Sequence, residues 1–188
     1  MDIEEIIRTR PDKSNFGGSA PWKLNHLYKI CKEINPTTII ESGTWRGNSL
    51  WLFRNLNKEI NLHSYEINYS TLMWEDNTIT YHNYDIEKDS GKHQIKGNDI
   101  IFFDDHVNQK SRLEWSYKNG FKHIIFDDNV PSEKLHAFGM PPTPTISMLS
   151  ETNELPEYVD FFKILDYDLT DTKAINNGQT YLTYLKIK

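Results

Sequence analysis

The sequence predicts an α/β protein with a doubly wound, mostly parallel sheet that ends in a C-terminal antiparallel hairpin. Three observations predict it. Short apolar runs of strand length alternate along the chain with helical patterns, which is typical of parallel sheets. The run at 99–104 is apolar almost throughout, as expected for a strand buried on both faces. The last two runs, 158–165 and 180–187, flank the turn signal Asn176-Asn177-Gly178.

Local signals place each element in order. Helical spacing of apolar residues predicts helices over 1–10 and 22–34, and Asn35-Pro36 ends the second. Strands are then expected at 37–41, 61–66, 79–84, 99–104 and 122–127, alternating with helices at 48–57, 69–74 and 108–119. The irregular segment 131–150 is predicted to be a lid. We expect one domain over 1–188, in which 1–36 supplies N-terminal helices and a substrate loop.

Composition limits the class of protein. The chain has 188 residues, of which 37% are hydrophobic and 13% aromatic, so it can bury a real core. Its net charge of −6 gives no basic footprint, and we expect no nucleic-acid partner. The acidic start and the lack of a long apolar run argue against a signal peptide or a membrane helix. With Cys31 as its one cysteine, the chain is expected to be cytoplasmic.

The most distinctive stretch is the turn at 41–49, Glu-Ser-Gly-Thr-Trp-Arg-Gly-Asn-Ser. It lies between two apolar runs, so we expect it to join the first strand to a helix. Glycine allows a tight turn or close approach to a ligand. Open α/β sheets bind ligands at the carboxyl ends of their strands. The turn therefore predicts a nucleotide-type cofactor site, with an ordinary strand-to-helix turn as the alternative.

A second acidic residue supports that hypothesis. Glu66 ends the second expected strand, 25 residues after Glu41. An acid about 20 residues beyond a glycine turn typically accepts hydrogen bonds from ribose hydroxyls. The alternative is a solvated loop acid. Together, the turn and Glu66 favour an adenosine cofactor.

Acidic residues also follow the fourth and fifth expected strands, as Asp104-Asp105-His106 and Asp127-Asp128-Asn129. Neighbouring strand ends lie about 5 Å apart, so these side chains are expected to converge. Their like charges would repel unless a cation lay among them, and oxygen ligands suit Mg²⁺ or Ca²⁺. The alternative is that some of these acids cap helices or pair with Lys110 and Arg112.

Four motifs occur in the order seen in one enzyme class. They are the turn at 41–49, Tyr65-Glu66-Ile67-Asn68, Asp105-His106 and Asp128-Asn129-Val130. In this order they resemble the class I methyltransferases that use S-adenosylmethionine (SAM). The chain looks most like the Mg²⁺-dependent O-methyltransferases, such as catechol O-methyltransferase. The resemblance implies a Rossmann-like fold, SAM and Mg²⁺ as cofactors, and O-methyl transfer to a hydroxyl of a small molecule or sugar.

The resemblance also implies roles for individual residues. The residues expected around the cofactor are Glu41, Gly43, Thr44, Gly47, Ser49, Glu66, Ile67, Asp85 and His106. Glu66 would bind the ribose hydroxyls and Ile67 would lie against the adenine. The metal ligands would be Asp105, Asp128 and Asn129. A related sugar- and antibiotic-modifying branch implies a different register, Asp104, Asp127 and Asp128.

One position departs from the resemblance. The catechol enzymes place a lysine, the general base, three residues after the metal aspartate of the fourth strand. Here that position is Asn108, which cannot take a proton at neutral pH. His106 or Lys110 would have to serve as the catalytic base, and histidine has a suitable unperturbed pKa. A small-molecule or sugar hydroxyl is therefore favoured over catechol.

Two other functions stay open. Asp166-Tyr167-Asp168 follows an apolar run and matches a metal–diphosphate pattern, which favours a metal-dependent nucleotide-sugar glycosyltransferase. The missing lysine instead favours a non-catalytic relative that binds a cofactor or a partner without turnover. The glycine spacings of NAD enzymes and of P-loop proteins do not occur at the turn.

Overall fold

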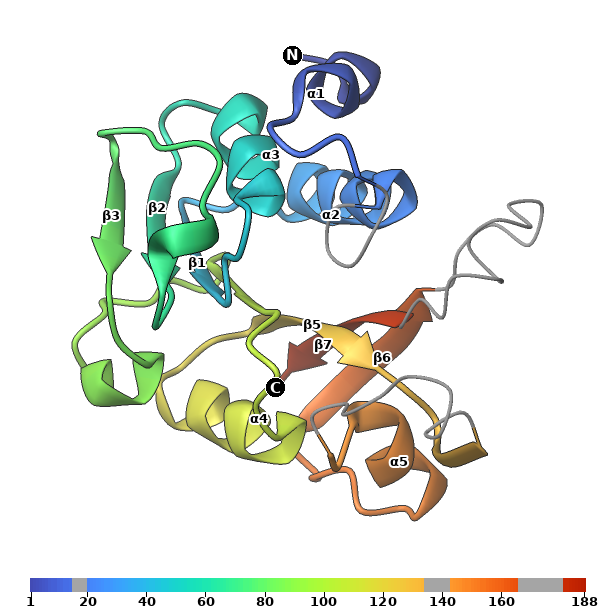
Figure 1. The fold of residues 1–188 in the computed structure, drawn as a ribbon. Helices are drawn as coiled ribbons and strands as arrows, with labels where there is room; N and C mark the ends of the chain where they lie inside the picture. Colours follow the sequence, from blue (N-terminus) through green and yellow to red (C-terminus); the bar gives the residue numbers. More distant parts are fainter. Residues whose placement is uncertain (15–19, 134–142, 166–180) are drawn as a thin grey trace.

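A computed structural model describes residues 1–14, 20–133, 143–165 and 181–188. Three sequence predictions fall wholly or largely outside these ranges: the turn at 176–178, the Asp-x-Asp motif at 166–168 and the middle of the 131–150 lid. The described chain is a central sheet with helices on both faces (Figure 1).

The strands form one seven-stranded sheet in the order β3-β2-β1-β4-β5-β7-β6. They are β1 (Thr38–Ser42), β2 (Asn61–Tyr65), β3 (Ile79–His82), β4 (Ile100–Phe103), β5 (His123–Asn129), β6 (Val159–Leu165) and β7 (Tyr181–Ile187). The first five run parallel to one another, whereas β7 is antiparallel to both β5 and β6. The predicted mostly parallel sheet with a C-terminal antiparallel pair is confirmed.

Helices cover the two faces of the sheet. They are α1 (Ile3–Thr9), α2 (Pro21–Ile34), α3 (Asn48–Leu56), α4 (Gln109–Lys118) and α5 (Ile146–Glu151), with single 3₁₀ turns η2 (Tyr69–Thr71) and η3 (Ile86–Asp89). In Figure 1, α1, α2 and α3 lie above the sheet and α4 and α5 below it. None of the helices in these ranges combines the length and apolar composition that a bilayer crossing needs.

The continuous apolar strands serve two cores at once. Ile39 and Phe102 pack in the core that includes α1, α2 and α3. Their immediate neighbours Ile40 and Phe103 pack in the core that includes α4 and α5. Successive side chains of a strand point to opposite faces, so a strand covered on both sides carries apolar residues at successive positions. Because both faces of these strands are packed, the polar residues that follow them are held in place at the carboxyl ends of the strands.

Two elements differ from the sequence prediction. The segment 131–150, expected to be irregular, contains the helix α5 at its end. Thr145 caps that helix by accepting a hydrogen bond from the Met148 backbone N–H at 3.3 Å. A six-residue helix is too short to show a helical period in the sequence. The helix expected over 69–74 is instead the three-residue turn η2.

Candidate functional site

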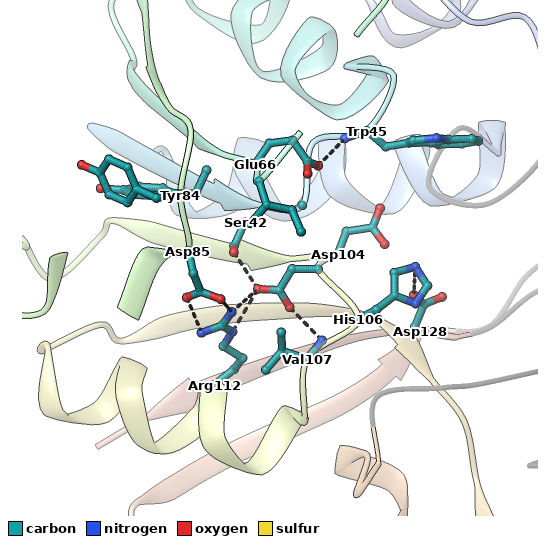
Figure 2. Close-up of a pocket in the computed structure, with 14 residues that line it drawn as sticks. Ser42, Trp45, Glu66, Tyr84, Asp85, Asp104, His106, Val107, Arg112 and Asp128 are labelled. Carbon is teal, nitrogen blue, oxygen red and sulfur yellow. Dashed lines mark hydrogen bonds and ion pairs between the residues drawn. The ribbon is translucent and has the colours of Figure 1, made fainter. Parts of the chain in front are cut away.

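A cavity of about 480 Å³ opens at the carboxyl ends of the parallel strands. Its walls come from the ends of β1, β2, β4 and β5, the segment after β3, and α4 (Figure 2). The lining residues are Ser42, Gly43, Trp45, Tyr65, Glu66, Ile67, Tyr84, Asp85, Asp104, Asp105, His106, Val107, Arg112 and Asp128. Five of the predicted cofactor residues are among them: Gly43, Glu66, Ile67, Asp85 and His106.

The glycine turn is shaped by a close backbone approach. Gly43 has φ +88°, and a Cβ there would lie 2.2 Å from the Asp104 carbonyl oxygen. The Gly43 N–H donates to the Tyr65 carbonyl at 2.9 Å, and the Asp104 N–H donates to the Ser42 carbonyl at 2.8 Å. Only glycine combines this φ with this spacing. The turn thereby joins the ends of β1, β2 and β4 into one cavity wall.

The Glu66 carboxylate holds the same turn. One of its oxygens accepts hydrogen bonds from the Thr44 and Trp45 backbone N–H groups, each at 3.1 Å. The other accepts from the Asn68 N–H at 3.1 Å. Figure 2 shows Glu66 beside Trp45 at the edge of the cavity. A carboxylate has about four acceptor sites, so capacity for ligand hydroxyls is left after these three bonds.

Four other predicted cofactor residues lie behind the turn and do not line the cavity: Glu41, Thr44, Gly47 and Ser49. Glu41 is fully buried, and its carboxylate accepts hydrogen bonds from Thr44 Oγ1 at 2.9 Å and from Ser49 Oγ. Desolvation raises the pKa of Glu41 to about 7, against the effect of those hydrogen bonds. Gly47, at φ +85°, starts α3. These residues support the turn from within.

The apolar part of the wall contains a large exposed side chain. Ile67 is 74% exposed, an unusual position for isoleucine, and it lies on the cavity. Tyr65 and Tyr84 line the same cavity and meet edge to face, with ring centroids 5.9 Å apart. An aromatic or apolar ligand group could be enclosed between such side chains.

A buried arginine links two acidic residues of the cavity wall. The sequence analysis named this residue, Arg112, only as a possible partner of the acids. Arg112 is 1% exposed, and its guanidinium donates to both oxygens of Asp85, at 3.1 and 2.8 Å. It also donates to Asp105 at 2.9 Å and lies 3.1 Å from a Glu87 carboxylate oxygen. Figure 2 shows the Arg112 guanidinium facing the Asp85 carboxylate, with their hydrogen bonds dashed. The arginine lowers the pKa of Asp85 against the opposing effect of desolvation.

In the predicted metal register Asp105, Asp128 and Asn129, two of the three side chains are engaged in hydrogen bonds within the protein. Asp105 accepts hydrogen bonds from Arg112 at 2.9 Å and from Ser42 Oγ at 2.6 Å. Asn129 is fully buried. Its side-chain Oδ1 accepts a hydrogen bond from the Ser147 backbone N–H at 2.9 Å, and its side-chain Nδ2 donates to the Thr183 hydroxyl. Both side chains already serve as internal hydrogen-bond partners.

A mixed set of ligand atoms converges instead. Atoms of Asp104, His106 and Asp128 all lie within 4.8 Å of one another. Asp104 and Asp128 belong to the second predicted register, but its third member, Asp127, forms a buried ion pair with Lys23 of α2. Burial and the neighbouring carboxylates Asp127 and Asp128 raise the pKa of Asp104 well above its ordinary range. Such crowding of carboxylates favours a bound cation.

No protein-family model and no curated protein sequence matches the chain. Solved structures do. An O-methyltransferase from Bacillus cereus, in complex with S-adenosylhomocysteine (SAH), superimposes with a TM-score of 0.60 at 16% identity, over 99% of this chain and 90% of its own. The chain shares the fold of this solved structure. A structure of CmcI described as Mg-SAM superimposes with a TM-score of 0.58 at 18% identity, over 89% of this chain and 72% of its own. The O-methyltransferase TomG from Streptomyces achromogenes, in complex with SAM, superimposes with a TM-score of 0.58 at 14% identity, over 90% of this chain and 81% of its own.

Within this fold, the two residues predicted as candidate bases differ in position. His106 lines the cavity and is 67% exposed, with its Nε2 3.3 Å from an Asp128 carboxylate oxygen. Lys110, in the first turn of α4, is not among the lining residues. Asn108, at the position expected for lysine, caps α4 by accepting from the Ser111 N–H at 3.1 Å. Its amide also donates to the Thr143 carbonyl at 2.9 Å.

Proposed function

We propose that the protein is a SAM-dependent O-methyltransferase that acts on a hydroxyl of a small molecule or sugar, assisted by a divalent cation. The observation that carries the proposal is the cavity at the carboxyl ends of β1, β2 and β4, which contains the glycine turn, Glu66 and Ile67. Ligands bind at this edge in open α/β sheets. The O-methyltransferases from Bacillus cereus and Streptomyces achromogenes, with SAH and SAM bound, support the choice of cofactor.

The residues present fit such a cofactor. The cavity volume of about 480 Å³ is in the range of small-molecule sites. Glycine at 43 allows the turn after β1 to lie against the Asp104 backbone, where a Cβ would lie 2.2 Å from the carbonyl oxygen. Glu66 would accept hydrogen bonds from the ribose hydroxyls, and Ile67 and Tyr84 would enclose the adenine. Asp85, already held by Arg112, would face the adenine edge with its remaining acceptor sites.

The chemistry of Asp104, His106 and Asp128 fits a divalent cation, since two carboxylates and an imidazole are all metal ligands. When bound, a divalent cation lowers the pKa of a hydroxyl and orients it. The protein would then mainly position donor and acceptor for in-line transfer. Asp104 and Asp128 would hold the acceptor end of the cavity, while Glu66 holds the cofactor end.

The His106 end is where we place the acceptor hydroxyl. Trp45 lines the cavity, is partly exposed and has the Arg46 guanidinium stacked 4.3 Å from its ring. An aromatic surface next to carboxylates suits the apolar face and the hydroxyls of a sugar or a small polar metabolite. No feature of this proposal calls for a nucleic acid or a membrane.

Calorimetric titration with SAH tests the proposal. We expect micromolar binding by the unmodified protein and at least tenfold weaker binding by Ile67→Asp, which places a charge where the adenine would lie. Ile164→Asp is the matched control, because Ile164 is also an exposed isoleucine but lies on the edge strand β6. Absence of SAH binding at millimolar concentration, or equal loss in both variants, would refute the cofactor assignment.

A further inference from the structure

We propose that the cation site of Asp104, His106 and Asp128 selects a first-row transition ion, such as Mn²⁺ or Zn²⁺, over Mg²⁺. The inference rests on the proposed function, because it concerns the same cavity. It differs from the Mg²⁺ that the sequence resemblance implies. The difference comes from a nitrogen ligand that the fold places among the oxygens.

The spacing of the ligand atoms fits a single ion. His106 Nε2 and an Asp128 carboxylate oxygen are 3.3 Å apart. Two adjacent ligands about 2.1 Å from one ion lie about 3.0–3.4 Å apart. The Asp104 carboxylate is near enough that all three ligand atoms fall within 4.8 Å of one another. A small contraction would close the set around an ion.

The identity of the ligands decides which ion is preferred. Mg²⁺ favours oxygen ligands in a near-ideal octahedron, whereas imidazole suits Zn²⁺ and the other transition ions. In the all-oxygen set of Asp105, Asp128 and Asn129, two members already have partners in the protein: Asp105 is bonded to Arg112, and Asn129 to Ser147 and Thr183. His106 contributes the third ligand atom instead. A nitrogen in the first coordination sphere therefore shifts the preference away from Mg²⁺.

The charge around the site favours a dication. Asp127 and Asp128 interact electrostatically with Asp104, and so does Lys23. Lys23 supplies one positive charge against these three carboxylates. A bound divalent ion would balance the charge without disturbing the buried Lys23–Asp127 pair. The excess of negative charge favours binding of a cation, and the His106 imidazole favours a transition ion over Mg²⁺.

The backbone conformation allows asparagine to replace His106 or Asp128 without added strain. His106 and Asp128 both have φ of 54°, in the left-handed region at the ends of β4 and β5. Asparagine adopts this conformation more readily than most residues. His106→Asn therefore exchanges imidazole for an amide oxygen without backbone strain, and Asp128→Asn removes one carboxylate charge. His106 is 67% exposed, so its replacement should not disturb the core.

The test is calorimetric titration of metal-free protein with MgCl₂, MnCl₂ and ZnCl₂ in turn, without SAM. Paramagnetic resonance of free Mn²⁺ gives a second readout. We expect Mn²⁺ and Zn²⁺ to bind at least tenfold more tightly than Mg²⁺. His106→Asn should remove most of that advantage and leave Mg²⁺ binding within about twofold, whereas Asp128→Asn should weaken all three ions. Asp160→Asn, an exposed carboxylate on β6, is the control.

Equal affinity for Mg²⁺ and Mn²⁺, or a Mn²⁺ and Zn²⁺ preference that survives His106→Asn, would overturn the inference. SAH titration of the same metal-free sample separates this failure from that of the proposed function. Binding of SAH with no ion preference refutes the transition-ion site alone. Ion selection without SAH binding refutes the methyltransferase proposal. His106 as a ligand is also unavailable as a proton acceptor, so the result decides between its two candidate roles.

Discussion

A side chain at Gly43 would collide with the backbone of Asp104: a Cβ there lies 2.2 Å from the Asp104 carbonyl oxygen and 2.6 Å from the Asp105 amide nitrogen. This contact seats the turn after β1 on the turn after β4. The contact sets the position of Glu66, on one side of the cavity, relative to Asp104 on the other side. The cavity depends on this approach of two backbone segments.

Gly43→Ala should therefore destabilise the protein by roughly 2–5 kcal/mol, from left-handed strain and overpacking together. Any folded fraction should bind SAH poorly. Gly97→Ala is the control, because a Cβ at Gly97 meets nothing within 4 Å. Urea denaturation of both variants measures the effect. Equal stability of the two variants would show that the strand ends are not in contact.

Arg112→Met should cost about 3–5 kcal/mol, since it leaves Asp85 and Asp105 without their buried cation. SAH affinity should fall as well, because both aspartates line the cavity. Arg8→Met is the matched control: Arg8 pairs with Glu5 on the exposed face of α1 and should leave the denaturation midpoint unchanged. A mild effect of Arg112→Met would mean that the cavity floor is solvated.

Glu41 should make the protein less stable as the pH rises. Its pKa is raised to about 7 by burial, so the folded state binds its proton more tightly than the unfolded state does. Stability from this group is complete below about pH 4.3, the ordinary glutamate value, and is lost as the pH rises through about 7. Glu41→Gln should lose this dependence. The stability difference between variant and parent, measured from pH 5 to pH 8, should shift by roughly 2–3 kcal/mol in favour of the variant. A constant difference would contradict the buried-proton assignment.

A histidine cluster beside the cavity should respond in the opposite sense. Burial lowers the pKa values of His63, His82 and His93. The unfolded state therefore binds protons more tightly, and stability from these groups is lost as the pH falls below about 6.5. Tyr84 and Tyr65 link the cluster to the cavity, because Tyr84 Oη is 3.1 Å from His82 Nδ1 and Tyr65 Oη is 2.6 Å from His93 Nε2.

The stability advantage of the parent over His82→Gln should shrink as the pH falls from 7.5 to 5.5. SAH affinity of the parent should fall over the same interval. Asp89 lies 3.8 Å from His82 and pairs with Lys92. Against the effect of desolvation, hydrogen bonds from Lys92, Tyr65 and Tyr84 lower the pKa of Asp89 to about 2, so it keeps its charge throughout. Parallel pH profiles for the two proteins would contradict this assignment.

The sequence predicted the sheet and the location of the site because both follow from patterns along the chain. Two-sided burial leaves β4 apolar throughout and β5 apolar over 124–126, so the acids at 104–105 and 127–128 stand out where the apolar runs end. The positive φ of Gly43 was likewise signalled by glycine in a turn. Helix α5 was missed because six residues show no period.

The sequence analysis named Arg112 as an alternative partner of these acids, which is confirmed for Asp105, but it could not give the burial of Arg112 or its bonds to Asp85. Arg112 is one charged residue on a polar helix, and its burial depends on how α4 packs beneath the sheet. Lys23 is similarly buried between α2 and the end of β5. The approach of His106 to Asp104 and Asp128 depends on the left-handed backbone at His106 and Asp128, which local sequence did not signal. These are properties of tertiary packing, which local sequence does not encode.

The proposed O-methyltransferase would hold its cofactor in the cavity at the ends of β1, β2 and β4. Two-dimensional ¹H–¹⁵N spectra recorded during titration with SAH locate the binding site residue by residue. We expect the amide signals of Gly43, Glu66 and Ile67 to shift. Those of Trp51 and Trp74, which line a separate cavity of about 400 Å³, should stay unchanged. Shifts centred on Trp51 and Trp74, or no shifts at millimolar SAH, would contradict it.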